Sequence, residues 1–95
     1  MRHAARIDAN QNGIVEALRA HGATVRIVTQ GNGLPDLLVG YRGETILMEV
    51  KDGNKPPSAR ALTPAEQKFF DEWRGGLLFI VNSVDEAIAA LKGIG

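Results

Sequence analysis

Three charged side chains near the middle of the chain have the types and the spacing to bind a metal ion and to act on a substrate beside it. Asp36 directly precedes the apolar run 37–41, and Glu49 lies near the end of a second apolar run, 45–50. Lys51 follows Glu49 by two positions, so in a strand both side chains lie on one face. If the two runs pair, two carboxylates and one ammonium group meet at one end of the pair.

The short connection between the two runs predicts a β-hairpin. With residues 42–43 as its loop, Tyr41 lies opposite Glu44, and counting outwards brings Asp36 opposite Glu49. Directly opposed residues on antiparallel strands have Cβ atoms roughly 4.5–5.5 Å apart. Two carboxylates at that separation repel each other unless a cation lies between them, and such oxygen ligands suit Mg²⁺ or Mn²⁺. The hairpin therefore predicts a metal site.

A simpler interpretation of the same charges stays open. Asp36 after Pro35 could cap a turn, and Glu49 with Lys51 could form the solvated face of an amphipathic strand. A longer loop would also shift the register and separate the two carboxylates. The convergence of three charges at one strand end favours the metal site.

A helix is predicted ahead of the strands, beginning at Asp8 with Gln11 as its capping-box partner and ending at Gly22. Gln11 lies one turn before the apolar stripe of this helix, so its side chain could reach the end of a sheet beneath, whereas Glu16 points to solvent. Capping alone explains Gln11 equally well. The stripe consists of Ile14, Val15 and Leu18.

Two loops are candidates for contacts with a phosphate backbone. The β-branched run 24–29 predicts a first strand, and the glycine-rich loop 30–33 with Asn32 leads from it into the hairpin. This loop opens a strand, so it does not fit a nucleotide-binding loop, and a turn or a close approach to substrate explains its glycines. The irregular segment 52–61 follows the charged hairpin end and suits a loop over the site, although a solvated linker explains it nearly as well. The basic candidates are Lys55, Arg60 and Lys68.

The last third of the chain predicts helix, strand and helix. Residues 63–66 (Thr-Pro-Ala-Glu) combine a cap, a proline and a glutamate, which is typical of a helix start, and this helix should run to about Arg74. The apolar run 77–82 predicts a strand buried on both faces. Ser83 with Glu86 starts a final helix. The apolar side chains expected to be buried are Phe69, Phe70 and Trp73 in the first helix and Val84, Ala87, Ile88 and Leu91 in the last.

Length and composition predict one small globular domain spanning 1–95. Hydrophobic residues make up 44% of the sequence and charged residues 23%. Cysteine is absent, which excludes disulfides and thiolate metal sites. No apolar run approaches the roughly 20 residues that span a bilayer, and no signal core is seen, so we expect a cytoplasmic protein without a membrane partner. Eleven basic residues balance eleven acidic ones, so net charge does not by itself indicate a nucleic-acid binder.

Four segments together resemble one nuclease family. Residues 8–11, 33–40, 49–51 and 62–67 read Asp-Ala-Asn-Gln, Gly-Leu-Pro-Asp-Leu-Leu-Val-Gly, Glu-Val-Lys and Leu-Thr-Pro-Ala-Glu-Gln. In this order they resemble the virus-type replication-repair nuclease (VRR-NUC) branch of the PD-(D/E)XK superfamily. The resemblance implies an α/β fold: a restriction-endonuclease-like αβββαβ core with a mixed central sheet flanked by helices, plus a C-terminal helix.

The resemblance also implies roles for individual residues. The positions of Asp36 and Glu49 hold the divalent metal, Mg²⁺ or Mn²⁺, helped by the carbonyl of Val50. The position of Lys51 orients or activates the attacking water and stabilises charge. The helix glutamine, here Gln67, contributes to the site. The first helix of the family often carries a glutamate where this chain has Gln11, so one anionic ligand is missing.

The function that follows is a metal-dependent endonuclease acting on structured or branched DNA as a homodimer. Small stand-alone members of the family resemble junction-resolving dimers of phage and bacterial origin. Phosphodiester hydrolysis needs charge neutralisation and a positioned water, which agrees with the residues at the hairpin end. Two alternatives remain: a non-catalytic nucleic-acid-binding module with a degenerate nuclease fold, and a structural or regulatory protein with a charged hairpin end.

Overall fold

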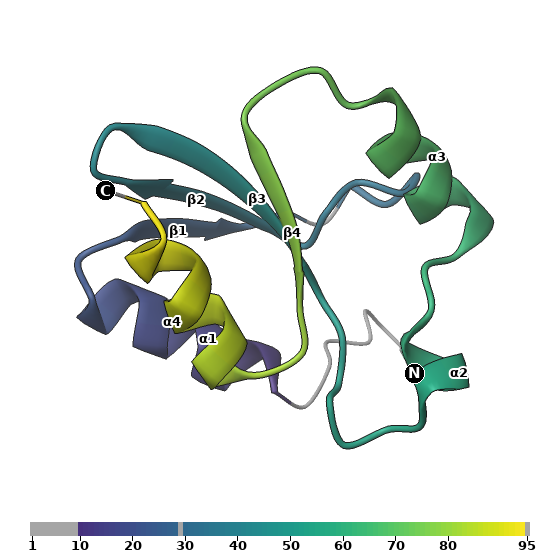
Figure 1. Cartoon of the computed structure of the whole chain (residues 1–95), viewed down its shortest axis with the longest axis horizontal. Helices are drawn as coiled ribbons and strands as arrows, with labels where there is room; N and C mark the ends of the chain where they lie inside the picture. The colour runs from purple at the N-terminus through teal and green to yellow at the C-terminus, as the bar shows by residue number, and fades with distance from the viewer. Residues whose placement is uncertain (1–9, 29, 95) are drawn as a thin grey trace.

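The computed structural model describes residues 10–28 and 30–94. Their element order confirms the predicted helix, three strands, helix, strand and helix, with one short helix added (Figure 1). None of the helices formed by these residues is long and apolar enough to cross a lipid bilayer. The elements are α1 (Gln11–Ala20), β1 (Thr24–Ile27), β2 (Leu37–Tyr41), β3 (Glu44–Val50), α2 (Pro57–Arg60), α3 (Pro64–Glu72), β4 (Leu77–Val81) and α4 (Val84–Lys92).

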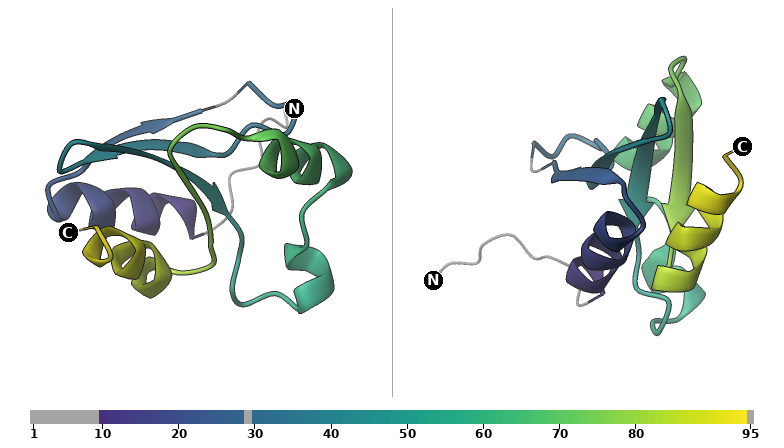
Figure 2. Two further views of the ribbon diagram at one scale, coloured as in Figure 1. Left: turned by 45° about the horizontal axis from the view of Figure 1, so that its top comes forward. Right: turned by 90° about the vertical axis from the view of Figure 1, so that its left-hand side faces the viewer.

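The strands form one mixed sheet in the order β1-β2-β3-β4. The pairs β1–β2 and β2–β3 are antiparallel, and β3–β4 is parallel. Helices α1 and α4 contact each other and lie on the same side of the sheet (Figure 2), whereas α2 and α3 lie away from them, to the right of the sheet in Figure 1. The predicted mixed sheet with flanking helices and a C-terminal helix is therefore confirmed.

The hydrophobic core lies between the sheet and these two helices. The predicted stripe of α1 is buried, and alternate residues of the strands meet it, as the strand period requires. Val84, predicted in the stripe of α4, is instead 38% exposed because it is the first residue of that helix. The buried core residues are Ile14, Val15, Leu18, Ala23, Val25, Leu37, Val39, Ile46, Met48, Val50, Val81, Ala87 and Leu91.

The hairpin that carries the charged residues has the predicted register. Residues 42–43 form its loop with φ of 50° and 81°, the left-handed conformation that a tight two-residue hairpin loop requires. Tyr41 pairs with Glu44, and the ladder continues to one pair short of Asp36 and Glu49. A short loop with a fixed geometry thus brings the two carboxylates to the same end of the hairpin.

Two further predictions of burial are wrong. The strand β4 ends at Val81 and is not buried on both faces: Leu77 is 37% and Ile80 40% exposed. Ile80 lies on the sheet face opposite to α1 and α4, which these helices leave uncovered, and Leu77 begins the strand at the edge of the sheet. No residue of α3 is buried either, since this helix lies away from the core, and Phe69, Phe70 and Trp73 are only half-buried. The rings of Phe69 and Trp73 stack with centroids 5.3 Å apart.

Helix boundaries and one loop also differ from the predictions. The helix α1 begins at Gln11, and the residue at its cap is Asn10, whereas the predicted cap Asp8 lies outside the described residues. The helix α3 ends at Glu72, short of the predicted end. Within the segment predicted to be irregular, Pro57 occupies the first position of α2, where its fixed φ favours a helical turn.

Candidate active site

The end of the β2–β3 hairpin brings Asp36, Glu49 and Lys51 together. The Oδ2 atom of Asp36 accepts a hydrogen bond of 2.7 Å from the backbone N–H of Val50. The charge of Asp36 acts on Glu49, whose side chain is almost completely buried. The Nζ atom of Lys51 lies 3.6 Å from Oε2 of Glu49. The predicted convergence of these three side chains is therefore present.

A third carboxylate, Glu66, completes this cluster. It comes from the first turn of α3, and its Oε1 atom lies 2.9 Å from Nζ of Lys51. The sequence offered Glu66 only as the capping partner of Thr63, and that capping box is also present. A lysine on a strand end can be paired with a distant glutamate only once the position of the helix is known, so spacing alone could not reveal this contact.

Burial first, and then the charges of Asp36 and Glu66, raise the pKa of Glu49 to about 9, although Lys51 works in the opposite direction. Within the part of the chain that the structure describes, the Oε1 atom of Glu49 is buried without a hydrogen-bond partner. A buried carboxylate with a raised pKa and an unmatched oxygen is stabilised by a nearby cation.

The charges of the cluster fit a divalent cation. When all are ionised, the carboxylates of Asp36, Glu49 and Glu66 outweigh the ammonium of Lys51 by two negative charges. One Mg²⁺ or Mn²⁺ would neutralise this excess and supply the missing partner of Glu49. Residues 10–28 and 30–94 contain no group of three or more acidic or histidine side chains arranged as metal ligands. A metal here would therefore need oxygen from another source, such as the predicted Val50 carbonyl.

Lys51 is held in its charged form. Burial works to lower the pKa of Lys51, but the hydrogen bond to Glu66 and the charges of Glu66 and Glu49 outweigh it and hold this pKa above its usual range. In turn, burial works to raise the pKa of Glu66, and the hydrogen bonds from Lys51 and Thr63 lower it overall. In the metal-free protein, Lys51 is thus suited to stabilise negative charge rather than to accept a proton.

The two glutamines predicted as site residues lie in different environments: one is buried and the other is exposed. Gln11 is 4% exposed and lies on the buried side of α1, as predicted, while Glu16 is exposed. Gln67 is exposed, and its Nε2 atom donates to Asp71 one turn later in the same helix, at 2.9 Å. Gln11 therefore has the inward position that a site residue needs, and Gln67 is held by its own helix.

The residues predicted to contact nucleic acid lie on loops and on α2 and α3. Asn32, Lys55 and Lys68 are exposed, and Asn32 has a positive φ of 58°. Arg60 is half-buried and donates from Nε to the carbonyl of Lys55 at 2.8 Å. Except for Arg60, these side chains are open to solvent.

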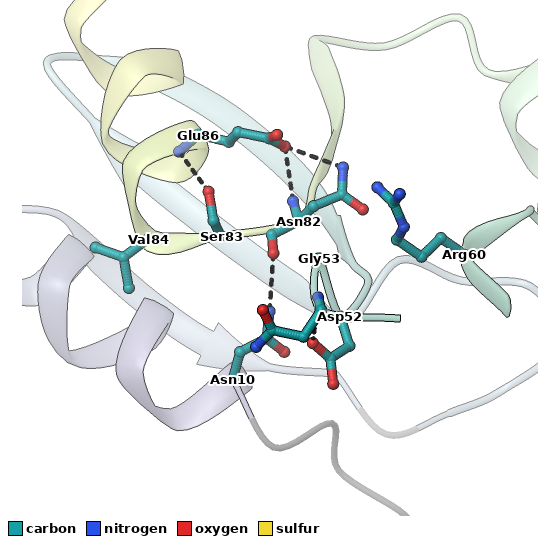
Figure 3. A pocket seen from close by; sticks show the side chains of 9 residues that line it. Asn10, Asp52, Gly53, Arg60, Asn82, Ser83, Val84 and Glu86 are labelled. Atoms are coloured by element: carbon teal, nitrogen blue, oxygen red, sulfur yellow. Dashed lines mark hydrogen bonds between the residues drawn. The ribbon is translucent and has the colours of Figure 1, made fainter. Parts of the chain in front are cut away.

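Beside this cluster lies a pocket that the sequence did not indicate (Figure 3). Asn10 lines this pocket, and its Nδ2 atom donates hydrogen bonds to the carbonyl of Lys51 at 2.9 Å and to that of Asn82 at 3.1 Å. The start of α1 is thereby tied to the ends of β3 and β4. The other lining residues are Asp52, Gly53, Asn54, Arg60, Ser83, Val84 and Glu86.

Comparisons with known proteins agree with this geometry. Neither protein-family models nor curated protein sequences match the chain. Among solved structures, a VRR_NUC domain matches with a TM-score of 0.68 and 28% sequence identity, over 90% of this chain and 92% of that chain. The likeness thus covers nearly all of both chains. With the motif residues gathered at the hairpin end, it identifies this chain as a VRR-NUC domain with a restriction-endonuclease-like fold.

Proposed function

We propose that this VRR-NUC domain is a divalent-metal-dependent endonuclease that hydrolyses phosphodiester bonds in structured or branched DNA. The observation that carries the proposal is the pairing of Asp36 with Glu49, whose buried Oε1 atom has no hydrogen-bond partner among the described residues. A nuclease-fold domain with such a pair, next to a lysine, has the groups that phosphodiester hydrolysis requires.

Each residue of the cluster has a proposed task. Asp36 and Glu49 bind Mg²⁺ or Mn²⁺ through carboxylate oxygens, with the Val50 carbonyl as a further ligand. When bound there, the metal would neutralise charge at the phosphate and lower the pKa of water. Lys51 orients the attacking water and stabilises negative charge on the phosphate, in keeping with its raised pKa. Gln11 adds a neutral hydrogen-bonding group from α1.

The DNA backbone is proposed to pass over the loops and helices beside the cluster. Asn32, Lys55, Arg60 and Lys68 would contact phosphates, which position a nucleic acid without reading its sequence. Gln67 follows Glu66 directly on α3 and would reach substrate by leaving Asp71.

A panel of labelled substrates tests the proposed specificity: duplex, single strand, flap and four-way junction, as DNA and as RNA. We expect cleavage of flaps or junctions to exceed cleavage of plain duplex in Mn²⁺. Equal cleavage of all DNA forms would contradict the preference for branched DNA while leaving the nuclease in place.

A homodimer is proposed because one small domain has little surface with which to hold two duplexes. Exposed apolar side chains support it, since Leu38 is 42% and Ile80 40% exposed on the face of the sheet opposite to α1 and α4. Sedimentation velocity at micromolar concentration should give a dimer, and Leu38→Glu should weaken it. Monomers alone in the wild type would contradict the dimer.

A non-catalytic nucleic-acid-binding module is the second candidate, and the observation that favours it is Gln11. This buried position carries an amide where the family resemblance leads us to expect a carboxylate. The module would bind DNA and cut none of it in any metal. Under that outcome, Gln11→Glu is the variant in which cleavage should be sought.

A further inference from the structure

We propose that Glu66 is a positioning residue that holds the ammonium group of Lys51 in place for the reaction; the inference rests on the proposed nuclease function. The sequence does not indicate this role for Glu66, because its spacing of three residues from Thr63 is already explained by a capping box. The structure adds the contact with Lys51, which lies 15 residues earlier in the chain.

The distances show which carboxylate holds the lysine. Nζ of Lys51 lies 2.9 Å from Oε1 of Glu66, within hydrogen-bonding distance, but 3.6 Å from Oε2 of Glu49. The side chains of Lys51 and Glu66 are only 13% and 18% exposed. An ion pair this well shielded from water is screened less than a surface pair.

The carboxylate of Glu66 is itself fixed by the start of α3. Its Oε1 atom accepts a second hydrogen bond of 2.9 Å from the backbone N–H of Thr63, and the Thr63 hydroxyl accepts one of 3.2 Å from the N–H of Glu66. Lys51, by contrast, has a flexible side chain with four methylene groups. The pair therefore joins a fixed acceptor to a mobile donor, and Glu66 decides where the ammonium lies.

The first turn of α3 is in turn placed against the loop that leads to Asp36. Gly33 has a φ of 82°, and a β-carbon at this position would collide with the carbonyl of Ala65. Backbone therefore packs on backbone between the two segments. No residue of α3 is buried, and both this contact and the Lys51–Glu66 pair hold the start of the helix beside the carboxylates.

The consequence concerns the metal site. Without Glu66, Glu49 is the nearest carboxylate to the ammonium of Lys51 and would attract it. A lysine paired directly with Glu49 would occupy the position that the metal needs. Glu66 thus keeps Lys51 beside Glu49 without letting it replace the metal.

The test variant is Glu66→Gln, and the matched control is Glu86→Gln. Glutamine can keep a capping box, so the start of α3 survives while the charge that holds Lys51 is lost. Glu86 lies three residues after the cap of α4, as Glu66 does in α3, and its N–H donates to Ser83 Oγ at 3.1 Å. Its Oε1 atom accepts a hydrogen bond from the backbone N–H of Asn82 and not from a lysine. The two variants change the same charge at equivalent positions of two helices.

We expect Glu66→Gln to lower kcat about 10- to 100-fold with KM nearly unchanged, which is the size of losing one charge-assisted hydrogen bond in the transition state. The Glu86→Gln protein should keep the wild-type kcat. A second readout, which needs neither metal nor substrate, is the NMR signal of the ¹⁵N-labelled ammonium group of Lys51. This signal is assigned by its absence from the spectrum of Lys51→Met. Its proton signal should be protected from exchange in the wild type and in Glu86→Gln, and lost in Glu66→Gln.

The outcomes separate this inference from the proposed function. If the wild type cleaves DNA but Glu66→Gln has the same kcat and the same protected signal, the positioning role is wrong and the nuclease stands. If the wild type cleaves no substrate, both the nuclease and the positioning role are wrong. An equal loss of kcat in both variants would also overturn the role, because it would trace the effect to helix capping.

Discussion

Replacing Asp36 by alanine is expected to lower the rate of DNA cleavage by at least about 10³-fold, the equivalent of about 4 kcal/mol of transition-state stabilisation. The reason is that Asp36 is one of two carboxylates that would hold the metal, and the second, Glu49, lies beside it with a strongly raised pKa. Initial rates on the best substrate in Mn²⁺ measure the effect.

The fold should survive this change. Asp36 accepts a hydrogen bond from the backbone N–H of Val50, and the loss of such a bond costs about 1 kcal/mol. Circular dichroism and thermal melting check that the variant is folded. Asp85→Ala, which removes a carboxylate from the exposed start of α4, is the control and should cleave like the wild type. Cleavage by Asp36→Ala within about tenfold of the wild type would contradict the metal-ligand role.

Replacing Glu49 by glutamine is expected to stabilise the metal-free protein at alkaline pH while removing its response to metal. The pKa of Glu49 is about 9 in the fold, against its ordinary value of 4.5 in the unfolded chain. Between these values the fold retains a proton that the unfolded chain has released. The free energy of unfolding therefore falls as pH rises through this window and levels off above the folded pKa. Glutamine carries no such proton, so this slope disappears.

Urea unfolding in chelator, between about pH 6 and pH 9, measures the difference. The midpoint of Glu49→Gln should exceed that of the wild type increasingly as pH rises. Adding Mg²⁺ should stabilise the wild type, since a ligand that binds only the fold shifts the equilibrium towards it, and should leave the variant unchanged. Glu44→Gln, at the exposed opposite end of β3, is the control. Parallel pH profiles for the wild type and Glu49→Gln would contradict the account.

The position of the carboxylate pair could be predicted because the hairpin depends only on local information. A loop at residues 42–43 fixes the register, and the register fixes which residues meet at the far end. Alternation along β3 then assigns Ile46, Met48 and Val50 to the core and Glu49 to the other face. Each step uses neighbours in the sequence, so no knowledge of the distant helices was needed.

The contacts of α3 and β4 could not be predicted because they depend on where elements lie relative to each other. An apolar run such as 77–81 indicates a strand but does not tell whether it lies inside a sheet or at its edge. Aromatic residues on α3 indicate an apolar side but not what covers it. The ion pair between Glu66 and Lys51 could not be predicted for the same reason, because the local role of Glu66 as a helix cap already explained its position in the sequence.

The most direct measurement is the cleavage of a labelled four-way junction by the wild type and by Lys51→Ala in Mg²⁺, in Mn²⁺ and in chelator. The arrangement of Asp36, Glu49 and Lys51 predicts cutting by the wild type in either metal, none in chelator, and a strong loss of cutting in Lys51→Ala. Cutting that persists in chelator, or a Lys51→Ala protein as active as the wild type, would contradict a metal-dependent nuclease built on these three residues.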